Sequence, residues 1–466
     1  MSTVKVIENL QEEVNPIKDA FERAGKRLYF VGGIVRDLLL GVVEETSVDI
    51  DLTTDATPDE IEGIVRPICD SIWLVGKRFG TIAIEISGRK FEITTHRAES
   101  YDPSSRKPLV KFSNSIEEDL SRRDFTINAM AMELTGTSSK LVDPFGGVED
   151  LINRKLKTPG SAEDSFVDDP LRMLRAARFI SRFSLDPSKD IVDAALEFRG
   201  RLEVVSPERI RDELSKLLLL PDPSDGLWFL VDTGLFDTFL PEIPALALEQ
   251  DPIHRHKDVL AHTIAVVSKT SPELILRLAA LLHDIGKPKT REIGPNGVSF
   301  HFHDVVGARM ARKRMQTLRF STQEIESVSK LVELHLRFHT YKAGWNDKAV
   351  RRYVRDAGPL LQQLNELTLA DVTTRDQNKV RFFHQKMEEL KERIEILSQQ
   401  EELASIRPEL DGNEVMEILG VGPSKEVGEA MEFLLEIRLD EGIIGKDEVT
   451  KRLLKWWRTR PITSVI

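Results

Sequence analysis

The feature that most constrains this chain is a Gly-Gly turn that follows a short apolar run. Residues 28–31 predict a buried strand, and Gly32 and Gly33 follow as a turn into a helix that Gly41 can end. Backbone N–H groups at such a helix start can approach a phosphate closely, because glycine has no side chain in the way. A Gly-Gly turn alone is more often a hairpin or a helix cap.

Two aspartates follow the turn on a second apolar segment, and they decide how the turn is interpreted. Residues 48–52 predict a strand, on which Asp49 and Asp51 project to the same side. Two neighbouring carboxylates repel each other and favour a divalent cation between them. Paired cations activate an attacking hydroxyl and neutralise a leaving pyrophosphate. Together, turn and aspartates predict a site for a nucleoside triphosphate and its metal ions rather than a solvated strand end.

Composition bounds the class of protein. The 466 residues are 41% hydrophobic and 30% charged, which predicts a soluble protein with several domains. No apolar run is long enough to cross a membrane, and the first residues lack a signal-peptide core. The single cysteine, Cys69, excludes an intrachain disulfide and fits the cytoplasm. A net charge of −12 argues against a general nucleic-acid coat but permits a local basic groove. The oligomeric state is left open.

Secondary-structure signals change character along the chain. Strand-like runs alternate with helical segments up to about residue 155, whereas apolar residues at helical spacing dominate afterwards. The sequence therefore predicts an α+β fold, a mixed head on a helical body. We divide it into a head at residues 1–155, a helical neck at 156–245, a histidine-containing part at 246–380 and a helical tail at 381–466.

A second motif in the head carries paired arginines, within Arg-Arg-Asp-Phe-Thr-Ile-Asn-Ala-Met-Ala at residues 122–131. Arg122 and Arg123 offer fixed forks of donors that suit triphosphate or sugar oxygens. Asp124 can orient these arginines, and Asn128 follows four residues later on the same predicted helical face. The alternative is a helix start with surface ion pairs.

At this point the chain resembles the bacterial class II CCA-adding tRNA nucleotidyltransferases, within the polymerase-β-like superfamily, and the related bacterial poly(A) polymerases. The resemblance covers nearly the whole chain. It includes the motifs above, Asp-Pro-Phe-Gly-Gly at 143–147, Asp-Asp-Pro-Leu-Arg-Met-Leu-Arg-Ala-Ala-Arg-Phe at 168–179 and Ser-Pro-Glu-Arg-Ile at 206–210. It implies a polymerase-β-like head with a mixed sheet, followed by all-α neck, HD and tail regions. It also implies Mg²⁺-dependent addition of C, C and A to the 3′ end of tRNA, from CTP and ATP and without a nucleic-acid template.

The motif at residues 168–172 suggests how a protein can choose the base. Asp169 and Arg172, three residues apart, share one face of a predicted helix. A carboxylate accepts from an exocyclic amino group and a guanidinium donates to a ring nitrogen, a pattern that cytosine and adenine match and that guanine and uracil invert. The alternative is an intrahelical ion pair. The family pattern is commonly Glu-Asp-x-x-Arg. Asp168 stands at the Glu position, which keeps the charge and alters its reach.

The resemblance assigns further roles in the head. It implies that Asp49 and Asp51 hold Mg²⁺ and align the 3′-hydroxyl for attack on the α-phosphate. The remaining nucleotide contacts that it implies are Gly32, Gly33 and Arg36 around the phosphates, Arg122, Asp124 and Asn128 along the nucleotide, and Arg175 and Arg178 in support. Glu92 resembles a third catalytic carboxylate, and is equally well an exposed strand residue. Residues 101–115 resemble the flexible loop that helps the switch from C to A, which favours full CCA synthesis over a CC-only relative.

A second constellation lies in the helical body. His262, His283, Asp284 and Asp371 resemble the HD phosphohydrolase pattern, and His303 and His335 stand between them. Imidazoles and carboxylates together suit Mn, Fe, Ni or Mg, and such centres lower the pKa of bound water. We expect a second metal here, with 2′,3′-cyclic phosphodiesterase or phosphatase activity as a secondary hypothesis. No role is assigned to His254, His256, His301 and His339.

The basic tail and the rival functions stay open at the level of sequence. Residues 446–460 carry Trp456 and Trp457 among lysines and arginines, which either grip the tRNA elbow or combine a core with a solvated face. The rivals to CCA addition are a poly(A) polymerase, an enzyme that adds only CC or only A, and an HD phosphohydrolase whose head binds RNA. Poly(A) polymerases often carry a strongly basic extension, which this acidic chain lacks.

Overall fold

The computed structural model describes residues 3–42, 50–100, 109–136, 140–247, 258–294, 297–339, 345–373, 376–401 and 406–459. The chain forms two compact units, Met1–Leu217 with Asp225–Phe239, and Leu218–Ser224 with Leu240–Ile466. The first unit contains the predicted head and most of the predicted neck, so the division into four parts stays a prediction. No helix of the described residues is long and apolar enough to cross a membrane.

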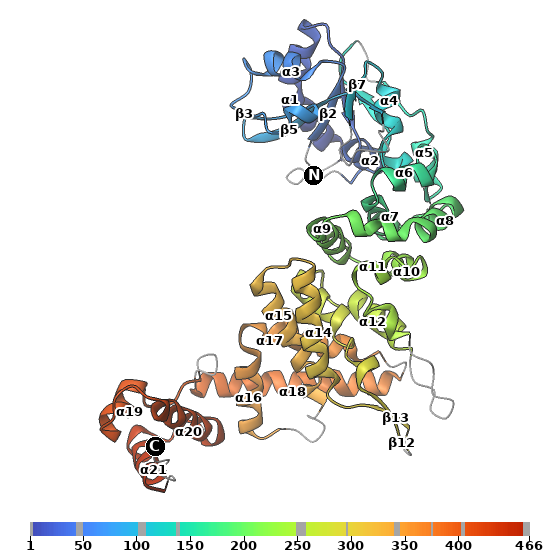
Figure 1. Cartoon of the computed structure of the whole chain (residues 1–466). Coiled ribbons are helices and arrows are strands. Elements are labelled where there is room, and N and C mark those ends of the chain that lie inside the picture. Colours follow the sequence, from blue (N-terminus) through green and yellow to red (C-terminus); the bar gives the residue numbers. More distant parts are fainter. Residues whose placement is uncertain are drawn as a thin grey trace. The chain divides into compact units, whose positions relative to one another are not determined.

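The head is built on a seven-stranded sheet in the order β3-β4-β5-β2-β1-β8-β9 (Figure 1). Its strands are β1 (Leu28–Val31), β2 (Ile50–Thr54), β3 (Ser71–Trp73), β4 (Thr81–Ile86), β5 (Arg89–Thr95), β8 (Ala131–Glu133) and β9 (Leu141–Val142). β2 and β5 are parallel and the other neighbours are antiparallel, which makes the sheet mixed as predicted. A separate hairpin joins β6 (Arg97–Ser100) to β7 (Leu109–Phe112).

Helices complete the head and give it one main core. They are α1 (Thr3–Arg23), α2 (Gly33–Leu40), α3 (Pro58–Val65), α4 (Ile116–Ser121) and α5 (Gly147–Ile152). The core joins Phe21 of α1 and Ile61 of α3 to Phe30, Leu52 and Phe91 of the central strands. α2 begins after Gly32 and ends at Gly41, which is in the left-handed conformation that a glycine favours at a helix end. The predicted strand–turn–helix is confirmed.

The neck helices are α6 (Ala162–Asp168), α7 (Leu171–Phe183), α8 (Lys189–Phe198), α9 (Pro207–Leu218), α10 (Ser224–Asp232) and α11 (Phe236–Phe239). α7 packs the neck against the head. Its apolar residues are buried, and Phe179 packs edge-on against Phe125 of the head. The arginines of α7 recur every three or four residues, so they gather on a different face from the apolar residues.

The second unit is almost entirely helical, with a short β-hairpin (Figure 1). Its elements up to residue 401 are α12 (Val259–Lys269), α13 (Leu274–Leu282), β12 (Arg291–Gly294), β13 (Gly297–Phe300), α14 (His303–Thr317), α15 (Thr322–Leu334), α16 (Asp347–Ala357), α17 (Leu361–Asp371) and α18 (Gln377–Glu401). Gly286 follows α13 where a Cβ would lie 2.2 Å from the carbonyl oxygen of His303. Only glycine lets the chain after α13 approach the start of α14 so closely.

Residues 406–459 form three further helices, α19 (Gly412–Leu419), α20 (Lys425–Glu441) and α21 (Lys446–Thr459), around a small core of their own. Trp456 packs against that core and stacks on Phe433 with ring centroids 5.0 Å apart. Lys446 and Arg452 of α21 are ion-paired with glutamates of the same unit. For Trp456 and these two cations, the structure therefore favours the core-and-ion-pair interpretation over an RNA contact.

Gly147 offers a test of the head's packing. A Cβ at Gly147 would lie 2.2 Å from the carbonyl oxygen of Thr126, whereas a Cβ at Gly160 would meet nothing within 4 Å. We expect Gly147→Ala to lower the midpoint of urea denaturation of the head, with a loss of about 1–3 kcal/mol, because the backbone must move to admit the methyl group. Gly160→Ala is the matched control and should leave the midpoint in place. Equal midpoints for the two variants would contradict the packing described here.

Candidate nucleotide site and metal centre

The Gly-Gly turn adopts a conformation that depends on glycine. Gly32 has φ +73°, a conformation that other residues rarely adopt, and its N–H donates to the carbonyl of Met130. A Cβ at Gly32 would lie 3.0 Å from Nη1 of Arg123. The absence of a side chain therefore lets an arginine lie directly over the start of α2.

The carboxylates lie on the two parallel strands at the centre of the sheet. Asp51 of β2 is in register with Glu92 of β5, and both are exposed between buried neighbours. Side chains in register on adjacent strands share one face of a sheet, so the two carboxylates project together. Asp49 lies outside the described residues. The structure places Glu92 beside Asp51, while its role stays a prediction.

A buried aspartate that the sequence analysis did not single out holds the paired arginines. Asp119 of α4 is fully buried, and it accepts hydrogen bonds from Arg122 Nη2 and Arg123 Nη2 at 3.0 Å and from the Arg97 N–H at 3.2 Å. Burial by itself raises the pKa of Asp119, but the charges of Arg123 and Arg122 outweigh it and lower that pKa to about 2. The spacing was the available signal, because Asp119 precedes the arginines by three and four residues.

Asp124 has a different partner from the one expected. Its Oδ2 accepts from Nε of Arg175 at 2.8 Å, and its Oδ1 accepts from Nδ2 of Asn128 at 3.0 Å. α4 has already ended at Ser121, so Asp124 does not share a helical face with the arginines before it. The expectation that Asp124 orients Arg122 and Arg123 is therefore wrong. It joins the head to α7 instead.

Arg36 also makes a structural contact. Its side chain is buried, it donates to Asp37 and Asn128, and its guanidinium lies 4.5 Å from the centre of the Phe183 ring. Burial lowers the pKa of Arg36, and the neighbouring Asp37 charge opposes that shift. The Arg36 side chain helps α2 pack against α7, and its guanidinium is already engaged by Asp37 and Asn128. The turn before Arg36, rather than its guanidinium, is therefore the candidate phosphate contact.

A pocket of about 270 Å³ lies beside these groups. Its lining comprises Arg122, Arg123, Asp124, Asp169, Leu171, Arg172, Arg175 and Arg209. The two predicted base-selecting residues therefore line one pocket together with three other residues of the predicted nucleotide site. Arg178 does not line it, because Glu213 accepts from its Nε at 2.8 Å.

Asp169 and Arg172 reach the pocket in a different way from the one predicted. Asp169 is extended between α6 and α7, as expected for a residue that precedes a proline, and is not part of a helical face. Asp169 Oδ2 accepts from Arg209 Nη2 at 2.9 Å, and Arg172 Nη1 donates to Ser165 Oγ at 2.9 Å. Arg172 also donates to the carbonyl of Arg122. These contacts replace the intrahelical ion pair that was the alternative.

Two further residues of the neck were missed by sequence reasoning. Arg209 holds Asp169, and the buried Glu213 holds Arg178 and lies 4.0 Å from Arg175. Their spacing of four residues on α9 places them on one face, and Arg209 also belongs to the motif at residues 206–210.

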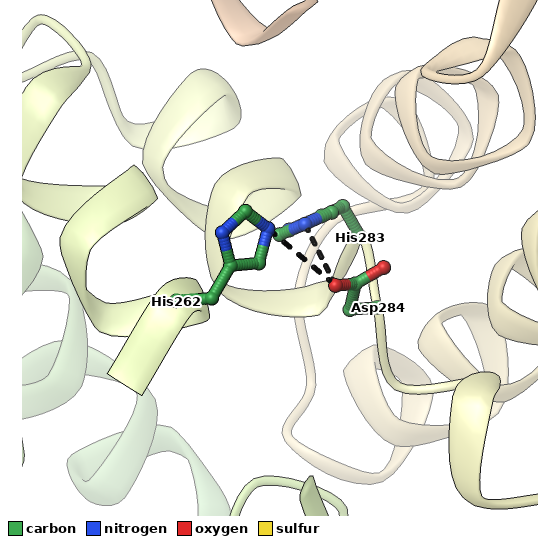
Figure 2. Close-up of side chains that lie close together, drawn as sticks. All are labelled: His262, His283 and Asp284. Atoms are coloured by element: carbon green, nitrogen blue, oxygen red, sulfur yellow. Dashed lines mark ion pairs between the residues drawn. The ribbon is translucent and has the colours of Figure 1, made fainter. Parts of the chain in front are cut away.

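The second constellation also converges. His262 of α12 and His283 at the end of α13 both direct Nε2 toward Asp284 Oδ2, at 3.7 and 3.2 Å (Figure 2). Asp371, the last residue of α17, brings Oδ1 within 2.8 Å of His262 Nε2 and 3.6 Å of His283 Nε2. All four predicted residues therefore meet in one place.

His303 and His335 complete a second group around the same aspartate. Ligand atoms of Asp284, His303 and His335 lie close enough together to hold an ion, as do those of His262, His283 and Asp284. Asp284 is thus common to two candidate ligand groups. Its Oδ1 lies 3.4 Å from His303 Nε2.

The imidazoles are oriented as metal ligands. Nδ1 of His283, His303 and His335 lies within hydrogen-bond distance of the backbone carbonyl three residues earlier, at 2.8, 2.7 and 2.6 Å. Each Nδ1–H can donate to its carbonyl, which leaves Nε2 as the lone-pair nitrogen. These three Nε2 atoms and Asp284 Oδ1 are buried without a hydrogen-bond partner. Orphaned acceptors of this kind fit a bound metal ion.

The carboxylates of the centre already lie beside positive groups, and Lys287 Nζ donates to Asp284 Oδ2 at 2.6 Å. Burial raises the pKa of Asp284 and of Asp371, yet the neighbouring histidines outweigh it and hold both well below the usual range. Burial lowers the pKa of His283, but the Asp284 charge outweighs it and raises that pKa to about 10. In contrast, burial and the charge of His283 lower the pKa of His335 to about 4. His254 and His256 lie outside the described residues.

The charge of Asp119 leads to a prediction about pH. Its pKa is about 2 in the folded protein, below the usual 3.8, so its ion pairs stabilise the head fully above about pH 4 and less as the pH falls toward 2. We expect Asp119→Asn to cost about 2 kcal/mol at neutral pH, and the difference from the original protein to shrink below pH 4. Urea denaturation at a series of pH values measures this. Glu149→Gln, at an exposed position, is the control, and a difference that grows on acidification would refute the assignment.

Family models match three parts of the chain. They are the poly A polymerase head domain over residues 28–157, a probable RNA- and SrmB-binding site of polymerase A over 184–246, and the HD domain over 259–376. An A-adding tRNA nucleotidyltransferase of Deinococcus radiodurans is 32% identical over 443 residues, which cover 92% of this chain and 94% of that protein.

The similarity to CCA-adding enzymes is higher but shorter. The enzyme of Geobacillus kaustophilus is 40% identical over 225 residues, so the match spans about half of each protein, 48% of this chain and 53% of that one. Among solved structures, the CCA-adding enzyme of Bacillus stearothermophilus in complex with CTP superposes with a TM-score of 0.70 at 24% identity, over 96% of this chain and 98% of the other. That likeness supports the expected fold. The chain belongs to the family of tRNA nucleotidyltransferases and poly(A) polymerases, and it is a nucleotidyltransferase with an HD domain.

Proposed function

We propose that this enzyme completes the 3′ end of tRNA in the cytoplasm, adding C, C and A from CTP and ATP without a nucleic-acid template. The observation that carries the proposal is the pocket in which Asp169 and Arg172 lie beside the arginines of the head. A carboxylate acceptor and a guanidinium donor in one pocket match the amino group and ring nitrogen that cytosine and adenine share.

The chemistry follows from the groups around the sheet. Mg²⁺, when held by Asp49 and Asp51, neutralises the triphosphate and favours attack by the 3′-hydroxyl. The N–H groups at the start of α2 contact phosphate oxygens together with Arg123, whose guanidinium lies over Gly32. Arg122 and Arg123 are aimed at the nucleotide because Asp119 fixes both. Pyrophosphate then leaves as the new phosphodiester forms.

Addition of A alone is the second candidate for the head. It is favoured by the Deinococcus radiodurans relative, which aligns over nearly the full length and is an A-adding enzyme. The loop expected to help the switch from C to A lies largely outside the described residues. Incorporation on tRNA transcripts that end before CCA, after C and after CC decides between the two. Growth to CCA on all three supports the proposal, addition to the CC transcript alone supports an A-adding enzyme, and long A tracts indicate a poly(A) polymerase.

The HD region has a proposed function of its own, as a metal-dependent phosphohydrolase that acts on RNA ends such as 2′,3′-cyclic phosphates. The specific observation is the pair of ligand groups that share Asp284. A bound divalent ion at such a centre supplies a hydroxide at neutral pH. The imidazoles contribute Nε2 lone pairs that hydrogen bonds at Nδ1 have already aimed.

Base selection gives the first functional prediction. We expect Asp169→Ala and Arg172→Ala to reduce discrimination of CTP and ATP against UTP and GTP by about 10- to 100-fold, since each removes one hydrogen-bonding partner of the correct base. The measurement is kcat/KM for each triphosphate on matched transcripts. Asp190→Ala, at an exposed position on α8, is the control. Unchanged discrimination in both pocket variants would exclude this pocket as the selector.

The two activities should separate by mutation. We expect Asp51→Asn to reduce nucleotide addition by roughly a thousandfold and to leave hydrolysis intact, because it removes a carboxylate of the head only. Asp284→Asn should have the opposite effect. The measurements are CTP incorporation into tRNA and hydrolysis of 2′,3′-cyclic AMP by the same preparations. Nucleotide addition that survives Asp51→Asn would refute the head assignment.

A further inference from the structure

Asp371 has an outer contact that the predicted ligand set does not explain. Its Oδ1 faces the ligand side, toward His262 and His283. Its Oδ2 lies 3.1 Å from Nε2 of His339. The two oxygens of the Asp371 carboxylate therefore contact different groups. The contact of Oδ2 is made by His339, to which the sequence analysis assigned no role.

His339 differs from three of the four histidines of the two ligand groups, His262 being the exception. In His283, His303 and His335, Nδ1 lies within hydrogen-bond distance of a backbone carbonyl. The Nε2 atom of each is buried and has no hydrogen-bond partner. Within the part of the chain that the structure describes, Nε2 of His339 contacts only Asp371, and no carbonyl fixes its Nδ1. The side chain is 33% exposed, at the rim of the centre.

The position of His339 is fixed from outside the centre. Its ring meets that of Phe383 edge to face, with centroids 5.9 Å apart. Phe383 belongs to α18, which begins six residues after Asp371. α18 is therefore connected to Asp371 through the imidazole of His339, which contacts both Phe383 and the carboxylate.

A carboxylate can bind an ion through either oxygen or through both, and a donor on one oxygen decides which of them is available. We propose that His339 is a positioning residue: its Nε2–H donates to Asp371 Oδ2 and so keeps Oδ1 directed at the ion. The inference rests on the proposed metal centre of the HD region. Such outer contacts typically change metal affinity by 10- to 100-fold.

The test uses the full-length protein freed of metal by chelation and titrated with Mn²⁺ alone, with free Mn²⁺ followed by electron paramagnetic resonance. Sites of this centre are those that Asp284→Asn removes. We expect His339→Ala to weaken their affinity at least about tenfold at unchanged stoichiometry. His339→Gln, whose amide can still donate, should restore part of the loss, and Phe383→Ala should weaken binding a few-fold. His384→Ala, an exposed histidine of α18, is the control.

Each outcome bears on a different claim. Normal affinity in His339→Ala overturns the inference while the metal centre stands. Loss of a whole site, as in Asp284→Asn, makes His339 a ligand and also overturns it. If the original protein has no site that Asp284→Asn removes, the proposed centre itself fails. Thermal unfolding of each metal-free variant, followed by circular dichroism, shows whether it is folded, so that weaker binding is not attributed to a misfolded protein.

Discussion

The candidate nucleotide site depends on buried carboxylates whose negative charge is balanced by neighbouring arginines. Asp119 and Asp124 are buried, and each would be costly to ionise without the arginines that surround it. Asp119 holds Arg122 and Arg123 within the head, and Asp124 holds Arg175 of α7. Removing the arginines would leave a buried carboxylate without its charged partners. The arginines are thereby oriented before a triphosphate arrives.

The same contacts join the head to α7, which carries the predicted base-selecting residue Arg172. Arg172 of α7 donates to the carbonyl of Arg122, and Arg175 of the same helix donates to the carboxylate of Asp124. The predicted phosphate-binding and base-selecting residues are therefore connected by hydrogen bonds.

The candidate metal centre differs from this network, because several of its ligand atoms have no hydrogen-bond partner. Three imidazoles are fixed through Nδ1, and their Nε2 atoms and Asp284 Oδ1 are buried without partners. The close approach at Gly286 brings His303 to the aspartate that follows α13. Ligand atoms arranged in this way fit a bound cation. His339 adds an outer contact that none of the ligands provides.

The sequence by itself determined which residues are candidates for a functional role and in which strands or helices they lie. Strand periodicity placed Asp51 on a strand, the glycines at 32 and 41 marked the ends of α2, and the HD pattern selected four residues that meet. Periodicity is local, so it carries this information without the fold. Only the tertiary structure decided which partner each charged group takes. Asp124 turned from its neighbours to Arg175, and Asp169 turned to Arg209, because packing of α7 and α9 places distant residues closer than sequence neighbours.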